Sequence, residues 1–326
     1  MKISHEQLLG EMKLLAPSLR VLAEQSVVLV PQLIKAAIGE EAFKGFFKVP
    51  PTCRLKDEAS ALAKLDRWAS VDSASEMIDL AGSRFVVLLR TDLDLVEKVI
   101  RDYTGWTVTR SRHFEYEVAS SPKAFDYQSI HLVVHAAAGS TINGALIDHD
   151  VSCEVQIRTL LQHAFAELCH DRIYKSEYVI PSDSTRVVAR CMALMETTDL
   201  MFCDAVGQIE QVQKSCDAWC EALVEGHEKI LLEARPAFDP TCRLLVETFW
   251  RLLAGVSHKQ VLQVTEARAL RTKLAKRRSS ALFSSAGCLL AYWLVKNHLI
   301  ETSKNWPEDS SRESLTLIGA DLGINI

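Results

Sequence analysis

The sequence lacks the short glycine-rich and nucleophile motifs by which many enzymes are recognised. Its 13 glycines form neither a G-x-x-x-x-G-K-[ST] phosphate loop nor a G-x-S-x-G turn around a catalytic serine. Its nine cysteines are an odd number without paired spacing, which indicates a reducing compartment and no disulfide framework. A formal net charge of −5 excludes a generally basic surface that would coat nucleic acid.

Long uninterrupted apolar runs are also missing from most of the chain. The most apolar stretch near the C-terminus, residues 281–295, is shorter than the roughly 20 residues of a membrane-spanning helix. The opening segment MKISHEQLLGEMK does not have the pattern of a signal peptide. We therefore expect a cytoplasmic protein without a membrane partner.

What the sequence does have is enough length and hydrophobic content for more than one domain. It has 326 residues, of which 48% are hydrophobic, so two or more compact parts are expected. A proline pair near residue 50 and the segment RPAFDP near residue 235 indicate joints. The predicted parts are a helical region at 1–50, a mixed domain at 51–235 and a helical accessory domain at 236–326.

Strand patterns concentrate in the middle part. Apolar residues alternate with polar ones over 150–158, which predicts a strand with one buried and one polar face. Other strands are expected over 85–89, 106–110, 114–118 and 130–137. Helical spacing dominates elsewhere, with interruptions expected at Pro17 and Pro31. This order predicts the α+β class, a mixed sheet flanked by helices and followed by an all-helical C-terminal domain.

Two carboxylates stand where neighbouring strands would bring them together. Asp79 comes just before the strand at 85–89, and Glu154 lies on the polar face of the strand at 150–158. Oxygen ligands of this kind suit Mg²⁺, which also binds substrate phosphates. The alternative is a pair of ordinary surface acids, which is the commoner situation for two isolated carboxylates.

Cations and an aromatic residue accompany these carboxylates in the sequence. Arg54, Lys56, Lys64 and Arg84 can together bind a triphosphate, although a solvated helix face would look the same. Tyr127 alternates with Ser129 and His131, so the three share one strand face. A tyrosine so placed can stack on a nucleobase, but tyrosine and histidine are also common in sheet cores.

In this order the segments resemble the synthetase domain of the RelA/SpoT-like alarmone synthetases, of the short single-domain type. The matching stretches are RLK at 54–56 with Lys64, IDLAGSR at 78–84, Lys123 with YQSIH at 127–131, and EVQIRT at 154–159 with AFAELCHDRIYK at 164–175. The resemblance covers about residues 50–235. It implies a nucleotidyltransferase-like synthetase domain with a mixed sheet.

The resemblance implies an enzyme, a pyrophosphokinase of the stringent response. Such an enzyme transfers the β,γ-pyrophosphoryl group of ATP to the ribose 3′-hydroxyl of a purine nucleotide, GDP or GTP, giving (p)ppGpp. By the same resemblance Asp79 and Glu154 bind Mg²⁺, and Glu154 activates the hydroxyl. The implied ATP ligands are Arg54, Lys56, Lys64 and Arg84. The implied acceptor contacts are Lys123, Tyr127, His131, Gln156 and Arg158.

Departures from the family pattern keep two other functions open. Phe125 and Asp126 stand where the family usually has an asparagine-like residue and a glycine, and Cys169 replaces a glutamate. A helix expected over 266–279 is rich in lysine and arginine, so it can contact tRNA or lie solvated. One alternative is therefore a toxin-type relative that pyrophosphorylates the 3′ end of tRNA. The other is a non-catalytic nucleotide sensor, and a homo-oligomer is possible for each.

Overall fold

The structure is a computed structural model that describes residues 3–67, 71–120, 129–170, 182–231, 239–264, 268–277, 280–307 and 312–325. Contacts divide the chain into two compact units, Met1–Ala205 and Val206–Ile326. The domain boundaries expected near residues 50 and 235 stay predictions.

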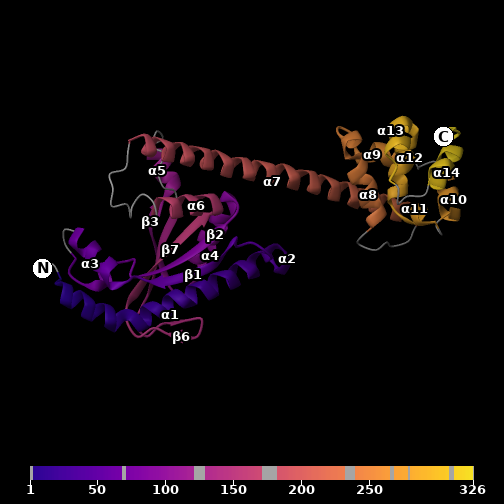
Figure 1. Cartoon of the computed structure of the whole chain (residues 1–326). Helices are drawn as coiled ribbons and strands as arrows, with labels where there is room; N and C mark the ends of the chain where they lie inside the picture. Colours follow the sequence, from indigo (N-terminus) through magenta and orange to yellow (C-terminus); the bar gives the residue numbers. More distant parts are fainter. Residues whose placement is uncertain are drawn as a thin grey trace. The chain divides into compact units, whose positions relative to one another are not determined.

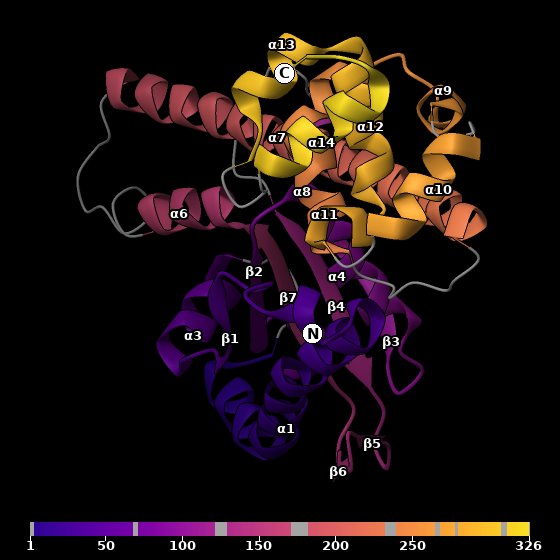
Figure 2. The same ribbon diagram turned by 90° about the vertical axis from the view of Figure 1, so that its right-hand side faces the viewer.

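A five-stranded mixed sheet forms the centre of the first unit. Its strands follow the order β1–β2–β7–β4–β3, side by side in Figure 2. Strands β2 and β7 are parallel, while the other neighbouring pairs are antiparallel. The bounds are β1 Val49–Leu55, β2 Ala81–Val87, β3 Thr107–His113, β4 Ile130–Ala136 and β7 Val151–Thr159. Two short strands, β5 Thr141–Ile142 and β6 Ala145–Leu146, form a separate hairpin.

Helices cover both faces of this sheet (Figure 1). Helices α1 (His5–Ile38) and α4 (Arg90–Asp102) pack on one face and on each other, and α6 (Leu160–Leu168) packs over β7 and β2. The apolar side chains of β7 point into the core, which leaves its polar side chains on the opposite face. The smaller elements are α2 Glu40–Phe43, α3 Glu58–Arg67, η1 Ala74–Glu76 and α5 Phe114–Ser120.

Two local predictions are wrong, and tertiary packing explains both. Helix α1 runs through Pro17 and Pro31 without interruption. Each proline removes a backbone hydrogen bond, but the helix buries a long apolar stripe against the sheet, which holds it together. The segment expected as a strand over 114–118 is helix α5. There Phe114 is buried beneath the guanidinium of Arg90, 4.8 Å from the ring centre.

Helix α1 also has the length and apolar character to cross a membrane. Its most apolar window has a mean hydropathy of 1.4, and 33% of that window is buried inside the protein. A single such helix is weak evidence for a membrane span, because core helices pass the same test. Its contacts with β1, β2 and β7 are those of a core helix.

The second unit is helical. Its helices are the C-terminal part of α7 (Ser182–Leu231), α8 Pro240–Phe249, η3 Trp250–Leu253, α9 His258–Gln263, α10 Arg268–Arg277, α11 Ala281–Ser284, α12 Gly287–Asn297, α13 Leu299–Asn305 and α14 Arg312–Leu322. Helix α12 is the core of this unit, buried from its first residue to Val295. It approaches α8 so closely that a Cβ on Gly287 would lie 2.9 Å from the Cα of Cys242. The predicted fold class, α+β with a mixed sheet and a helical C-terminal part, is confirmed.

The basic helix of the second unit is partly engaged within its own unit. Lys273 of α10 lies 3.1 Å from the buried carboxylate of Asp321 on α14, and Arg277 pairs with the same carboxylate. Tyr292 of α12 donates a third hydrogen bond to it. Two of the cations expected to meet tRNA therefore stabilise the packing of α10.

Candidate active site

The polar faces of β1, β2 and β7 line a cavity of about 370 Å³, which α6 borders on one side. The lining includes seven residues predicted for the site, which are Arg54, Lys56, Asp79, Arg84, Glu154, Gln156 and Arg158. Lys64 and His131 reach this set through direct contacts with Asp79 and Glu154. Lys123 and Tyr127 lie outside the described residues, as do Phe125 and Asp126.

Strand register explains why these side chains meet. Arg54, Gly82 and Glu154 are Cα partners in a row across β1, β2 and β7. Gly82 has no side chain, so the cavity floor stays open between the other two. A Cβ at this position would meet nothing closer than the Glu154 carbonyl oxygen at 3.7 Å. The pairing of β1 with β2 and of β2 with β7 thus places Arg54 and Glu154 on either side of this open floor.

Asp79 is held by two lysines. The Nζ atoms of Lys56 and Lys64 each lie 2.7 Å from its Oδ2 atom. Lys56 directly follows β1, and its backbone N–H donates to the carbonyl of Leu80, which fixes the approach of the two chain segments. Burial acts to raise the pKa of Asp79, but the hydrogen bonds from the two lysines outweigh it and hold the pKa below its usual value. Asp79 is therefore ionised at neutral pH.

Glu154 begins a chain of hydrogen bonds along the cavity. Its Oε1 lies 3.0 Å from Nδ1 of His131, and its Oε2 accepts from Nε2 of Gln156 at 2.7 Å. Arg158 in turn donates to the Gln156 amide oxygen at 2.5 Å. Burial favours a higher pKa for Glu154, but His131 and Gln156 hold the pKa below its usual value, with Asp79 opposing them. The chain fixes the orientation of an ionised carboxylate.

Helix α6 and the residues directly after it contribute side chains that the sequence reasoning missed. Glu167 accepts a hydrogen bond from Arg84 at 2.6 Å, and His170 also lines the cavity. His163 lies 3.5 Å from the same Glu167 oxygen, and burial together with the Arg84 charge lowers the pKa of its imidazole. Positions 163, 167 and 170 recur at helical spacing just after β7, and this spacing was the signal available in the sequence.

The donor atoms present fit a Mg²⁺ ion. The Oδ1 atom of Asp79 is buried and has no hydrogen-bond partner in the described part of the chain. Asp79 and Glu154 line the same cavity and repel each other electrostatically. Within the same described ranges no three His, Cys, Asp or Glu side chains form a metal-binding group. Two carboxylates with room for water and phosphate are the usual setting for Mg²⁺.

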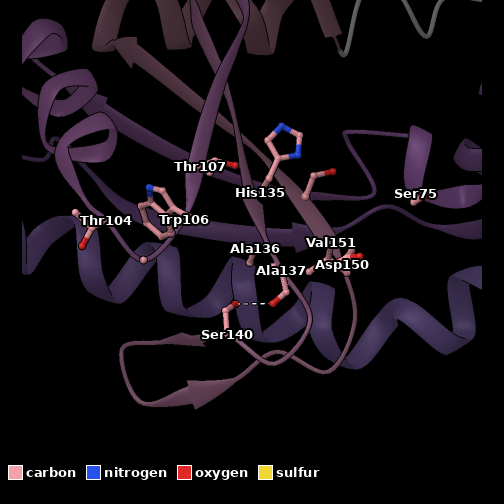
Figure 3. Close-up of a pocket in the computed structure, with 12 residues that line it drawn as sticks. Ser75, Thr104, Trp106, Thr107, His135, Ala136, Ala137, Ser140, Asp150 and Val151 are labelled. Atoms are coloured by element: carbon pink, nitrogen blue, oxygen red, sulfur yellow. Dashed lines mark hydrogen bonds between the residues drawn. The ribbon is translucent and has the colours of Figure 1, made fainter.

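A second cavity, of about 400 Å³, lies where β4 ends and β7 begins (Figure 3). His135, Thr107, Ser140 and the carboxylate of Asp150 are among its lining residues. Among the described residues its lining contains no lysine or arginine to neutralise a triphosphate. The cavity around Asp79 and Glu154 is therefore the better candidate for phosphate chemistry.

Comparison with known proteins identifies this part of the chain. Residues 53–178 match the family described as "Region found in RelA / SpoT proteins". Every residue predicted for the site falls within the matched segment. The predicted resemblance to the RelA/SpoT-like alarmone synthetases is confirmed.

Individual proteins that are similar to this chain share low sequence identity with it. GTP pyrophosphokinase YjbM of Bacillus subtilis (strain 168) is 28% identical over 163 residues, 50% of this chain and 74% of that protein. The crystal structure of small alarmone synthetase 1 from Bacillus subtilis bound to its product pppGpp shares 24% identity at a TM-score of 0.49, over 59% of this chain and 95% of that one. A GTP pyrophosphokinase family protein from Streptococcus pneumoniae shares 20% at a TM-score of 0.44, over 64% and 94%.

Proposed function

We propose that the protein is an ATP-dependent pyrophosphokinase that transfers the β,γ-pyrophosphoryl group of ATP to the ribose 3′-hydroxyl of GDP or GTP. The observation that carries the proposal is one cavity in which two ionised carboxylates, Asp79 and Glu154, stand among lysines and arginines. Phosphoryl-type transfer depends on positioning and on charge neutralisation, which this set of side chains can supply. The match to a RelA/SpoT region and the similarity to a GTP pyrophosphokinase support the same reaction.

Residues on the two sides of the cavity have different tasks in this proposal. Arg54, Lys56, Lys64 and Arg84 bind the ATP phosphates. Gln156 and Arg158 follow Glu154 on the same face of β7, and His131 lies on the neighbouring strand β4; together they bind the acceptor nucleotide in this proposal. Lys123 and Tyr127 are proposed as further acceptor contacts on the strength of the sequence resemblance.

The reaction joins the acceptor 3′-oxygen to the β-phosphorus of ATP and breaks the bond between that phosphorus and the oxygen of the α-phosphate. AMP leaves, and Glu154 accepts the proton of the 3′-hydroxyl. His131 and Gln156 hold the Glu154 carboxylate in a fixed orientation while it does so. A Mg²⁺ ion held by Asp79 and Glu154 would neutralise charge on the phosphates.

The structure does not favour the alternatives. For tRNA, two cations of the basic helix α10, Lys273 and Arg277, are paired with Asp321, whereas Arg271 and Lys276 are exposed. For a non-catalytic sensor, nothing requires two partly buried carboxylates that repel each other in a phosphate site. Both alternatives become outcomes of one experiment.

The test incubates purified protein with Mg²⁺ and ATP labelled in the γ-phosphate, together with GDP, GTP, ADP or tRNA in separate reactions. We expect label in GDP or GTP, and a fall of about 10²–10⁴-fold in rate for Glu154→Gln, which keeps the shape of the side chain but cannot accept the proton. Lys44→Met, at an exposed cation paired with Glu41, serves as the control and should keep the wild-type rate. Label only in tRNA would favour the toxin-type reaction, and nucleotide binding without any labelling would favour the sensor.

A further inference from the structure

Lys56 and Lys64, which contact Asp79, affect how a metal ion can bind to this carboxylate. We infer that Lys56 and Lys64 block the Asp79 carboxylate until a triphosphate draws them away, so that the metal ion binds tightly only together with nucleotide. This inference rests on the proposed function, because it concerns the same carboxylate and the same phosphates. It assigns the lysines a second role, that of a gate on the metal site.

The first argument is electrostatic. Both ammonium groups contact one oxygen atom, Oδ2 of Asp79, each at 2.7 Å. The three side chains are only 18–20% exposed, so water screens their charges weakly. A divalent cation that approaches this carboxylate meets two positive charges at contact distance and is repelled. The free protein therefore binds the ion poorly.

The second argument concerns the number of ligands. Asp79 and Glu154 are two carboxylates, and the described ranges contain no group of three metal-binding side chains. Mg²⁺ fills its remaining positions with water and substrate phosphates. A bound triphosphate thus adds oxygen ligands for the ion and, at the same time, offers the lysines a partner other than Asp79. Both effects increase the affinity for the metal ion when the triphosphate is bound.

The exchange also keeps every charge paired. Without nucleotide, the lysines neutralise Asp79. With nucleotide, the phosphates pair with the lysines and the metal ion pairs with Asp79. Leaving a partly buried charge without a partner is costly. The nucleotide-free state and the state with both nucleotide and metal bound are therefore each more stable than a state with only one of the two bound. Metal and nucleotide binding are therefore coupled, and the coupling is reciprocal.

The test measures binding of Mn²⁺, as a paramagnetic probe of the metal site, to the nucleotide-free protein by electron paramagnetic resonance. Lys64→Met removes one ammonium group at nearly constant side-chain length, and we expect Mn²⁺ affinity to increase by about tenfold. Lys56→Met should act in the same direction, which keeps the test valid if one variant does not fold. Lys44→Met, at an exposed lysine that pairs with Glu41 and is not among the residues lining the cavity, should leave Mn²⁺ affinity unchanged.

A gain of metal affinity is the opposite of what general damage to a site produces. Adding Asp79→Asn to Lys64→Met should abolish the gain, since the newly accessible ligand is then lost. Unchanged or weaker Mn²⁺ binding in both folded lysine variants overturns the inference. Failure of the wild-type protein to bind a non-hydrolysable ATP analogue in the presence of Mg²⁺ would instead refute the proposed function. Normal binding of that analogue with unaltered Mn²⁺ binding in the lysine variants refutes the gate alone.

Discussion

Replacing Thr159 by valine is expected to destabilise the protein where β7 ends and α6 begins. Thr159 is fully buried. Its hydroxyl donates to Oδ2 of the buried Asp199 at 2.7 Å and accepts the N–H of Gln162 at 3.1 Å, which caps helix α6. Valine has nearly the same shape, so the substitution removes both hydrogen bonds and leaves the packing in place.

The magnitude follows from these two contacts. Loss of the N-cap costs about 1 kcal/mol. Loss of a hydrogen bond to a buried carboxylate costs about 1.5–3 kcal/mol, because the other carboxylate oxygen of Asp199 already lacks a partner in the described part of the chain. We expect the free energy of unfolding to fall by about 3 kcal/mol at pH 7.

The loss should depend on pH in a defined direction. Burial raises the pKa of Asp199 above its usual value of 3.8, and the Thr159 hydrogen bond opposes this rise. An acid with a raised pKa stabilises the folded state below the unfolded value, and that stabilisation is lost as pH increases through the folded value. Without the hydroxyl the pKa of Asp199 rises further, so Thr159→Val should lose less stability at pH 5 than at pH 7.

Urea unfolding followed by circular dichroism at both pH values is the assay. Thr159→Ser keeps the hydroxyl and serves as the matched control, with an expected loss within about 1 kcal/mol. A loss below about 1 kcal/mol for Thr159→Val at pH 7, or an equal loss at the two pH values, would contradict the argument that this hydroxyl supports the buried carboxylate.

Two further predictions concern the core and a buried ion pair. Phe85→Ala removes a fully buried ring from β2, and urea unfolding should show a loss of about 3–5 kcal/mol, with Phe85→Leu losing clearly less. Glu97 is a buried carboxylate in which hydrogen bonds from Arg110 and Arg101 outweigh burial and lower the pKa, so its stabilisation is complete above its usual value of 4.5 and is lost as pH falls. Glu97→Gln should be less stable than wild type by about 2 kcal/mol at pH 7, the difference should shrink as the pH falls below 4.5, and a constant difference would refute this reasoning.

Local pattern was enough to locate the strand that carries the site. Apolar residues alternate from Val151 to Ile157, and a period of two describes a strand whatever surrounds it. The same alternation puts Glu154, Gln156 and Arg158 on one face, where the structure has them. Side chains two residues apart in a strand lie on the same face, whatever tertiary contacts the strand makes.

Local pattern was misleading where packing competes with it. The period of two around Phe114 predicted a strand, yet the segment forms α5 with the ring buried under Arg90. Likewise, Pro17 and Pro31 predicted breaks in a helix that the sheet holds continuous. The energy of burying apolar surface against the sheet exceeds these local preferences, and the sequence does not show which surface will be buried.

By itself, then, the sequence determined which side chains are available and which of them share a face. Only the tertiary structure decided which side chains contact one another, because these contacts depend on the register of strands that are far apart in the chain. Parallel pairing of β2 with β7 sets Gly82 opposite Glu154, and the return of the chain after β1 brings Lys56 to Asp79. Glu167 joins them because α6 packs back over β2. A shift of one residue in any of these pairings would turn the charged side chains to the opposite face, so the site exists only in the folded sheet.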